Sequence, residues 1–201
     1  MRTLGPDGKS QDFFLTADHV LAENNRDLHN LRMKEAGLIS ADKADHSKKF
    51  SDADAQLQPL VEPGRFDRSN DSIAIATSAP AKALSLVEAG RRPLIGQEFQ
   101  LTGFPAVEYG EYTSRTCTFV GYGRNRSGLG TAYYVDCPAA EFASQAGNSG
   151  AALVDQEGKV WGVHASDLNR RNGLLRVSPL AVDADGKLVH GIQDSFVTNF
   201  C

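Results

Sequence analysis

Several features that define other classes of protein are scarce or missing in this sequence of 201 residues. No apolar run approaches the length of a membrane-spanning helix, and no secretory signal peptide opens the chain. Basic residues do not outnumber acidic ones, and the formal charge of −4 argues against a surface that mainly binds nucleic acid. We therefore expect no membrane insertion and no nucleic-acid partner. These absences do not define the compartment.

Cysteine is also scarce, with only Cys117, Cys137 and Cys201 in the chain. Three cysteines do not make a disulfide framework, and they show neither the spacing of a metal site nor a cysteine-nucleophile motif. The simpler interpretation is three unrelated thiols. The alternative is that Cys117 and Cys137, which fall in adjacent expected strands, pair across a hairpin. No metal or organic cofactor is expected.

What the chain does contain is typical of a β-rich globular protein. Hydrophobic residues make up 41% and charged residues 23%, and nineteen glycines accompany many turn signals. In the second half, regular short strands separated by turns predict a closed barrel. The expected strands are Gln11–Leu15, Leu57–Val61, Glu98–Gly103, Thr116–Tyr122, Thr131–Asp136, Ala151–Asp155, Val160–His164 and Leu174–Val177.

Two distant segments indicate a chemical function when they are considered together. Phe14–Leu21 is an apolar run that contains His19. In Gly147–Val154, Ser149 lies between two glycines and precedes an apolar strand. Each segment alone is weak evidence. A serine hydroxyl needs an adjacent imidazole to take its proton, so the pair predicts a nucleophile and its base in a hydrolase.

A buried carboxylate should orient that imidazole and stabilise its protonated form. Asp71 opens an alternating run with Ile73 and Ile75 on one face, so a strand could aim the carboxylate inward. We therefore predict Asp71 as the orienting acid, with a plain strand-capping role as the alternative. Three other aspartates compete, but no apolar strand follows them directly: Asp52, Asp54 and Asp67.

With these residues assembled, the chain resembles the chymotrypsin-like (trypsin-like) serine endopeptidases. Leu15–His19 looks like their Thr-Ala-x-His signature, and Gly147–Gly150 like their Gly-x-Ser-Gly. The chain order His, Asp, Ser is also theirs. The resemblance spans about residues 2–180 and is closest in pattern to bacterial glutamyl endopeptidases and RNA-virus serine proteases. It implies an all-β fold of two antiparallel barrels with the active site between them, residues 1–90 carrying His19 and Asp71 and residues 91–201 carrying Ser149.

The same resemblance assigns roles near the serine. The backbone amides of Gly147 and Ser149 match the positions that stabilise the oxyanion in the family. His164, fifteen residues after Ser149, matches a histidine that glutamyl endopeptidases place on the wall of the specificity pocket. This implies a preference for Glu or Gln before the cut, because an imidazole and a hydroxyl can hydrogen-bond those side chains. The other expected substrate-binding residues are Ser144, Ala165 and Ser166.

One feature departs from the family pattern, because only eighteen residues precede His19. We expect an N-terminal barrel that lacks a strand, or a chain that is part of a larger precursor. The partner is expected to be a protein or peptide substrate. Two alternatives to a freely acting endopeptidase stay open: a cis-acting viral enzyme that processes its own polyprotein, and a non-catalytic protease-like binding module.

Overall fold

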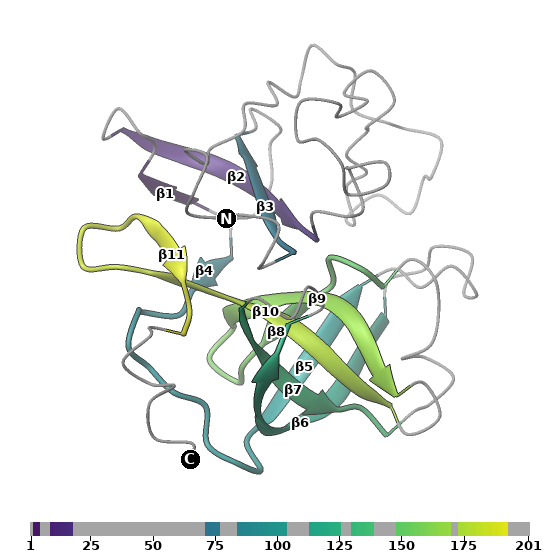
Figure 1. Cartoon of the computed structure of the whole chain (residues 1–201). Coiled ribbons are helices and arrows are strands. Elements are labelled where there is room, and N and C mark those ends of the chain that lie inside the picture. The colour runs from purple at the N-terminus through teal and green to yellow at the C-terminus, as the bar shows by residue number, and fades with distance from the viewer. Residues whose placement is uncertain are drawn as a thin grey trace, which may run out of the picture.

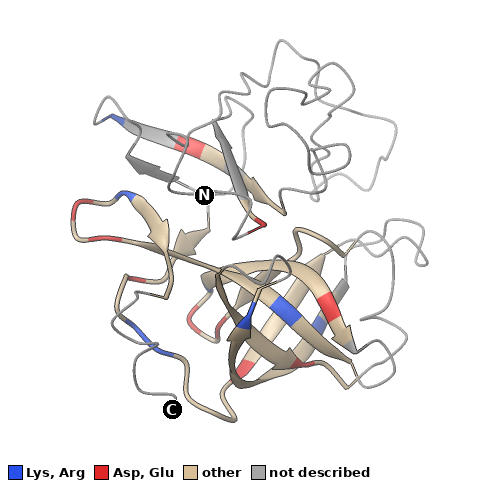
Figure 2. Cartoon of the chain, viewed as in Figure 1, with Lys and Arg blue, Asp and Glu red and all other residues tan. Residues whose placement is uncertain are grey.

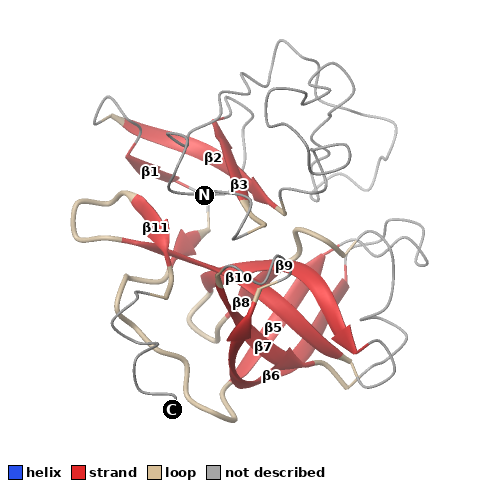
Figure 3. Ribbon diagram, viewed as in Figure 1, coloured by secondary structure: helices blue, strands red, loops and turns tan. Residues whose placement is uncertain are grey.

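The computed structural model describes residues 2–4, 9–17, 71–76, 84–103, 113–125, 130–138, 148–169 and 173–192. Within these ranges every regular element is a β-strand (Figure 3). The prediction of an all-β fold is therefore confirmed. The described part of the chain contains no helix long and apolar enough to cross a membrane.

The N-terminal strands form a three-stranded antiparallel sheet in the order β1-β2-β3. These strands are β1 (Arg2–Leu4), β2 (Ser10–Thr16) and β3 (Ile73–Ala76). In the β2–β3 pair, Thr16 lies opposite Ile73, so the end of β2 meets the start of β3. The strand predicted at Gln11–Leu15 is confirmed, whereas the one predicted at Leu57–Val61 lies outside the described residues.

The remaining strands form one eight-stranded sheet in the order β11-β10-β7-β6-β5-β8-β9-β4. An additional pairing of β10 with β9 closes the strands from β5 to β10 into a six-stranded barrel (Figure 1). The strands are β4 (Ser85–Leu86), β5 (Glu98–Gly103), β6 (Thr113–Arg124), β7 (Thr131–Asp136), β8 (Ala152–Val154), β9 (Lys159–Asn169), β10 (Leu174–Val182) and β11 (Leu188–His190).

The alternation of inward-facing and outward-facing side chains along the barrel strands determines which residues form the core. In β5, buried and more exposed residues alternate as a strand with one inward face requires. Large side chains from all six barrel strands fill the interior, and each contributes about 1.5–3 kcal/mol when it is removed from water. The largest that are fully buried are Phe99, Leu101, Phe119, Tyr133, Leu153, Trp161 and Leu175. This packed barrel is the rigid base on which the serine loop is built.

A disulfide joins β6 to the end of β7, which corrects the interpretation of three unrelated thiols. Thr118 pairs with Asp136, so the next residues outward, Cys117 and Cys137, lie opposite each other with their Cα atoms 4.3 Å apart. Directly opposed residues at this separation are within bridging distance. Both cysteines are completely buried in the barrel core. Cys201 lies outside the described residues.

Candidate active site

Ser149 lies in a tight turn that ends in β8. The turn is closed by the Ala151 amide, which donates to the Asn148 carbonyl at 2.9 Å. Strand β9 then holds the turn from the other side, because the Gly150 amide donates to the His164 carbonyl and the His164 amide donates to the Ala151 carbonyl, both at 2.8 Å. Ser149 itself is partly exposed, as the predicted role of a nucleophile requires. The barrel therefore fixes the serine loop through backbone bonds to β9.

Gly150 allows the end of β2 to approach this loop. Its φ of +89° lies in the left-handed region, and a Cβ at this position would overlap the side chain of Thr16. Thr16 is buried and Ala17 is completely buried. The end of β2 therefore lies beside the residue that follows Ser149. His19 lies outside the described residues.

Asp71 lies at a second contact between the N-terminal sheet and the barrel. The residue is buried, and its carbonyl oxygen accepts a hydrogen bond from the Ser178 hydroxyl of β10 at 3.4 Å. Among the described residues it is the one non-glycine residue with positive φ, at 48°. Aspartate tolerates this conformation better than most residues, but it still costs of the order of 1 kcal/mol. Such strain directly before a strand re-aims the chain at a site where Asp71 is predicted to act.

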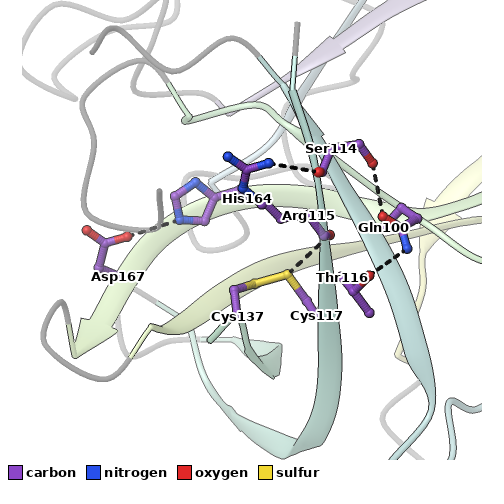
Figure 4. Close-up of a disulfide and its surroundings, with 8 residues drawn as sticks. All are labelled: Gln100, Ser114, Arg115, Thr116, Cys117, Cys137, His164 and Asp167. Atoms are coloured by element: carbon purple, nitrogen blue, oxygen red, sulfur yellow. Dashed lines mark hydrogen bonds and ion pairs between the residues drawn. A yellow bond between two sulfur atoms is a disulfide. The ribbon is translucent and has the colours of Figure 1, made fainter. Parts of the chain in front are cut away.

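His164 is buried and lies beneath the serine loop on β9. Its Nδ1 faces the carbonyl oxygen of Asn148 at 3.0 Å, and its Nε2 faces Oδ1 of Asp167 at 3.3 Å (Figure 4). The second contact is within ion-pair distance but lacks the alignment of a hydrogen bond. The imidazole thus lies between the main-chain carbonyl of Asn148 and the carboxylate of Asp167 on its own strand.

The other predicted substrate-binding residues of β9 follow His164. Ala165 is buried, and Ser166 is half-buried with its hydroxyl accepting from Nη1 of Arg176 at 3.4 Å. Gly147 and Ser144 lie outside the described residues, as His19 does. No group of three or more side chains suited to a metal ion occurs within the described ranges.

The contact between His164 and Asp167 could not be found from the sequence pattern. Residues three apart on a regular strand point to opposite faces. In the pairing of β9 with β10, Ser166 lies opposite Arg176 and His164 opposite Val177, so Ala165 is an extra, bulged residue. A bulge of this kind returns His164 and Asp167 to the same face.

The sequence model of the trypsin family matches residues 9–177, which is most of the chain. The chain belongs to the trypsin family. It is a chymotrypsin-like serine endopeptidase, and the protease fold expected from its motifs is confirmed. As a peptidase it acts on protein or peptide substrates. No curated protein sequence matched the chain.

Solved structures of trypsin-like proteases share the fold. The active form of the Rv3671c protease from M. tuberculosis superposes with a TM-score of 0.55 at 20% identity, over 89% of this chain and 73% of that one. An inactive serine-to-alanine mutant of the same M. tuberculosis protein gives 0.56 at 18% identity, over 88% and 73%. Its inactive form gives 0.54 at 19% identity, over 88% and 76%. At these low sequence identities, the similarity to the three structures establishes a shared fold.

Proposed function

We propose that Ser149, His19 and Asp71 form the catalytic triad of this endopeptidase. Ser149 attacks the peptide carbonyl, His19 takes the serine proton and later gives it to the leaving amine, and Asp71 orients His19. The product of the first step is an acyl-enzyme that water then hydrolyses. The observation that carries the proposal is the double approach of the N-terminal sheet to the barrel, Thr16 against Gly150 and Asp71 against Ser178.

The oxyanion would be stabilised by the backbone amides of Gly147 and Ser149. The turn at Ser149 supports this role, because the bonds of Gly150 and Ala151 to their neighbours fix the backbone before substrate arrives. Preorganised donors of this kind need no rearrangement as charge develops on the carbonyl oxygen. Residues 1–90 and 91–201 would be the two halves that meet at this site.

The pocket for the residue before the cut would be bordered by Ser144, His164, Ala165 and Ser166. His164 supports this assignment by its position, since its backbone is bonded to both Gly150 and Ala151. A buried imidazole next to the serine loop suits a substrate side chain that carries oxygen atoms, because an apolar pocket would disfavour such a side chain. Glu or Gln would therefore be the preferred residue.

The test is cleavage of a library of internally quenched peptides by the wild type and by single variants. Ser149→Ala and His19→Ala should each lower kcat on the order of a millionfold, because removing either member leaves the triad without its proton transfer. The matched control is Ser85→Ala, which removes an exposed hydroxyl from β4 and should leave cleavage unchanged.

Cleavage by Ser149→Ala at the wild-type rate would contradict the assignment of the triad. If neither the wild type nor the variants cleave free peptides, a cis-acting enzyme or a binding module becomes the better interpretation. In that case a longer chain with a Glu or Gln junction should be tested for self-cleavage.

A further inference from the structure

The main-chain carbonyl of Asn148, directly before the nucleophile, accepts two hydrogen bonds. The Ala151 amide donates to it at 2.9 Å, and Nδ1 of His164 lies 3.0 Å from it. A carbonyl oxygen only accepts, so the contact with the ring is a hydrogen bond in which Nδ1 carries the hydrogen. Asn148 is completely buried, so solvent does not compete for this oxygen. Two donors from different segments therefore fix the direction of one carbonyl.

That carbonyl belongs to the same peptide group as the Ser149 amide. The peptide bond between the two residues is trans, and a trans peptide is planar, so its carbonyl oxygen and its N–H point in opposite directions. Directing the Asn148 oxygen toward the ring of His164 thus directs the Ser149 N–H away from it. This N–H is one of the two proposed oxyanion donors, which work only when they are aimed in advance at the developing charge. The side chain of His164 therefore sets the aim of a donor in the neighbouring loop.

The imidazole is itself held in place. Its side chain is 4% exposed, and its Nε2 faces Oδ1 of Asp167 at 3.3 Å (Figure 4). Val177, which lies opposite His164 on β10, is completely buried. A ring that is already confined by its neighbours loses little conformational freedom when it donates a hydrogen bond. The bond from Nδ1 is therefore a preorganised restraint on the serine loop.

The main chain of His164 restrains the other side of the same loop. Its carbonyl and amide bond Gly150 and Ala151, which follow the serine, whereas the ring bonds Asn148, which precedes it. One residue of β9 thus holds the chain both before and after Ser149. A substitution at His164 keeps the main-chain groups, so it isolates the contribution of the ring.

We propose that His164 is a positioning residue of the oxyanion site, which presets the Ser149 N–H through the Asn148 carbonyl. This inference rests on the proposed function, because it requires the Ser149 amide to stabilise the oxyanion. It goes beyond a role in the pocket, because the ring then contributes to the cleavage of every substrate, whatever the side chain before the cut. The contribution belongs to kcat, since the charge on the carbonyl oxygen develops only after the substrate is bound.

The experiment measures kcat and KM for two peptides that differ only in Gln or Ala before the cut. His164→Leu removes the donor and keeps a side chain of comparable size. Removing an oxyanion donor outright lowers kcat by about 100- to 1000-fold, so losing its aim should lower kcat about 10- to 100-fold, by the same factor for both peptides. His164→Asn places a side-chain N–H donor about as far from the main chain as Nδ1, so kcat should stay within about threefold of the wild type.

His190→Leu is the matched control. Nδ1 of His190 also lies close to a main-chain carbonyl, that of Ile192 at 2.7 Å, but β11 pairs with neither β8 nor β9. Its loss should leave kcat unchanged for both peptides. Near-ultraviolet circular dichroism establishes which variants are folded.

A loss confined to the Gln peptide would overturn the inference, because a role in the pocket alone gives that result. Unchanged kcat in folded His164→Leu would overturn it as well. So would a loss in folded His164→Asn as large as in His164→Leu, because a purely structural role of the ring predicts no rescue by a donor.

The wild type provides a test that does not depend on the folding of any variant. Nitrogen-15 spectra should show a hydrogen on Nδ1 of His164 and a scalar coupling from this nitrogen to the Asn148 carbonyl carbon. An Nδ1 atom without hydrogen defeats the inference. Ser149→Ala separates the two proposals: where cleavage depends on Ser149, any of these contrary results defeats only the role of His164. Cleavage that survives in Ser149→Ala, or no cleavage by the wild type, defeats the proposed function and this inference together.

Discussion

Single residues set the geometry at which the N-terminal sheet meets the barrel. Asp71 accepts a left-handed backbone conformation, and Gly150 accepts another at the serine loop. Gly150 also leaves the space that Thr16 fills. The two requirements differ, because the backbone conformation would disfavour any side chain, whereas the space matters only where a neighbour is present.

Gly150→Ala should therefore cost more than an ordinary glycine substitution. Gly158 has a similar φ of +78° but nothing within 4 Å of an added Cβ, so Gly158→Ala is the control for the backbone term alone. We expect Gly158→Ala to lower the free energy of unfolding by about 1 kcal/mol, and Gly150→Ala by about 2–3 kcal/mol. Urea unfolding of both variants measures the difference.

Activity gives a second check on Gly150→Ala. Because the added methyl group would displace Thr16 and the segment toward His19, kcat should fall by at least about 100-fold. In the double variant with Thr16→Ala the overlap is relieved, so part of the lost stability should return. Equal stability losses in Gly150→Ala and Gly158→Ala would show that Thr16 does not restrict this position.

At the scale of elements, an aspartate carboxylate accepts hydrogen bonds from two backbone amides in each of two hairpin turns. The two aspartates differ in how deeply they are buried. Asp155 accepts from the amides of Glu157 and Lys159, both at 2.9 Å, in the turn between β8 and β9. Asp183 accepts from Asp185 at 3.0 Å and Lys187 at 2.8 Å between β10 and β11. Each turn ends at a glycine with positive φ.

Asp155→Ala should destabilise the protein more than Asp183→Ala. Asp155 is buried, and its Oδ2 also accepts from the indole nitrogen of the core residue Trp161 at 2.7 Å. Its removal leaves that N–H and two turn amides without their acceptor, at a cost of about 2–4 kcal/mol. The turn at Asp183 is partly exposed, so water can solvate its amides when the carboxylate is removed. Asp183→Ala should therefore cost about 1 kcal/mol or less. Thermal unfolding of the two variants is the measurement, and equal losses would contradict the role of Trp161.

The bulge at Ala165 is another property of an element that decides chemistry. Without the extra residue, His164 and Asp167 would lie on opposite faces of β9. Bulges are frequent next to active sites because they re-aim single side chains while the strand stays paired. Here the bulge brings the side chains of His164 and Asp167 to the same face of β9.

At the scale of the whole molecule, stability resides in the closed barrel. Its core includes edge-to-face pairs such as Phe99 with Trp161 and Phe119 with Tyr133. Charges of both signs are interspersed over the described strands and turns (Figure 2). Surface pairs such as Lys159 with Glu88 lower the pKa of Glu88, mainly through the Lys159 hydrogen bond, but exposed pairs contribute little to folding.

Tyr133 should make the folded protein sensitive to alkaline pH. Burial raises the pKa of its phenol well above the ordinary value of 10, and the neighbouring Tyr122 adds to the shift. The folded state therefore binds this proton more tightly than the unfolded state. Its contribution to stability is full below about pH 10 and is lost as pH rises beyond that value, by up to about 1.4 kcal/mol per unit.

The measurement is the urea midpoint of the wild type and of Tyr133→Phe between pH 8 and 11. The phenylalanine variant keeps the buried ring and loses the titrating group, so its midpoint should fall less steeply above pH 10. Parallel curves for the two proteins would show that Tyr133 does not carry the alkaline dependence.

The sequence by itself determined much of the local structure, because strand and turn signals depend on near neighbours. The strands at Glu98–Gly103 and Thr131–Asp136 have the predicted bounds, and the family follows from the segments around His19 and Ser149. Hydrophobic alternation and glycine positions are enough for this. The strand β11 was missed, since its three residues are too few for a pattern.

Only the tertiary structure decided which distant residues touch. The Cys117–Cys137 disulfide depends on the exact register of β6 against β7, and one step of register would separate the two sulfur atoms. The His164–Asp167 pair depends on a bulge that β10 imposes on β9. The approach of Thr16 to Gly150 depends on packing between two sheets. Such contacts arise from pairing and packing across the fold, and a single sequence contains no local signal for them.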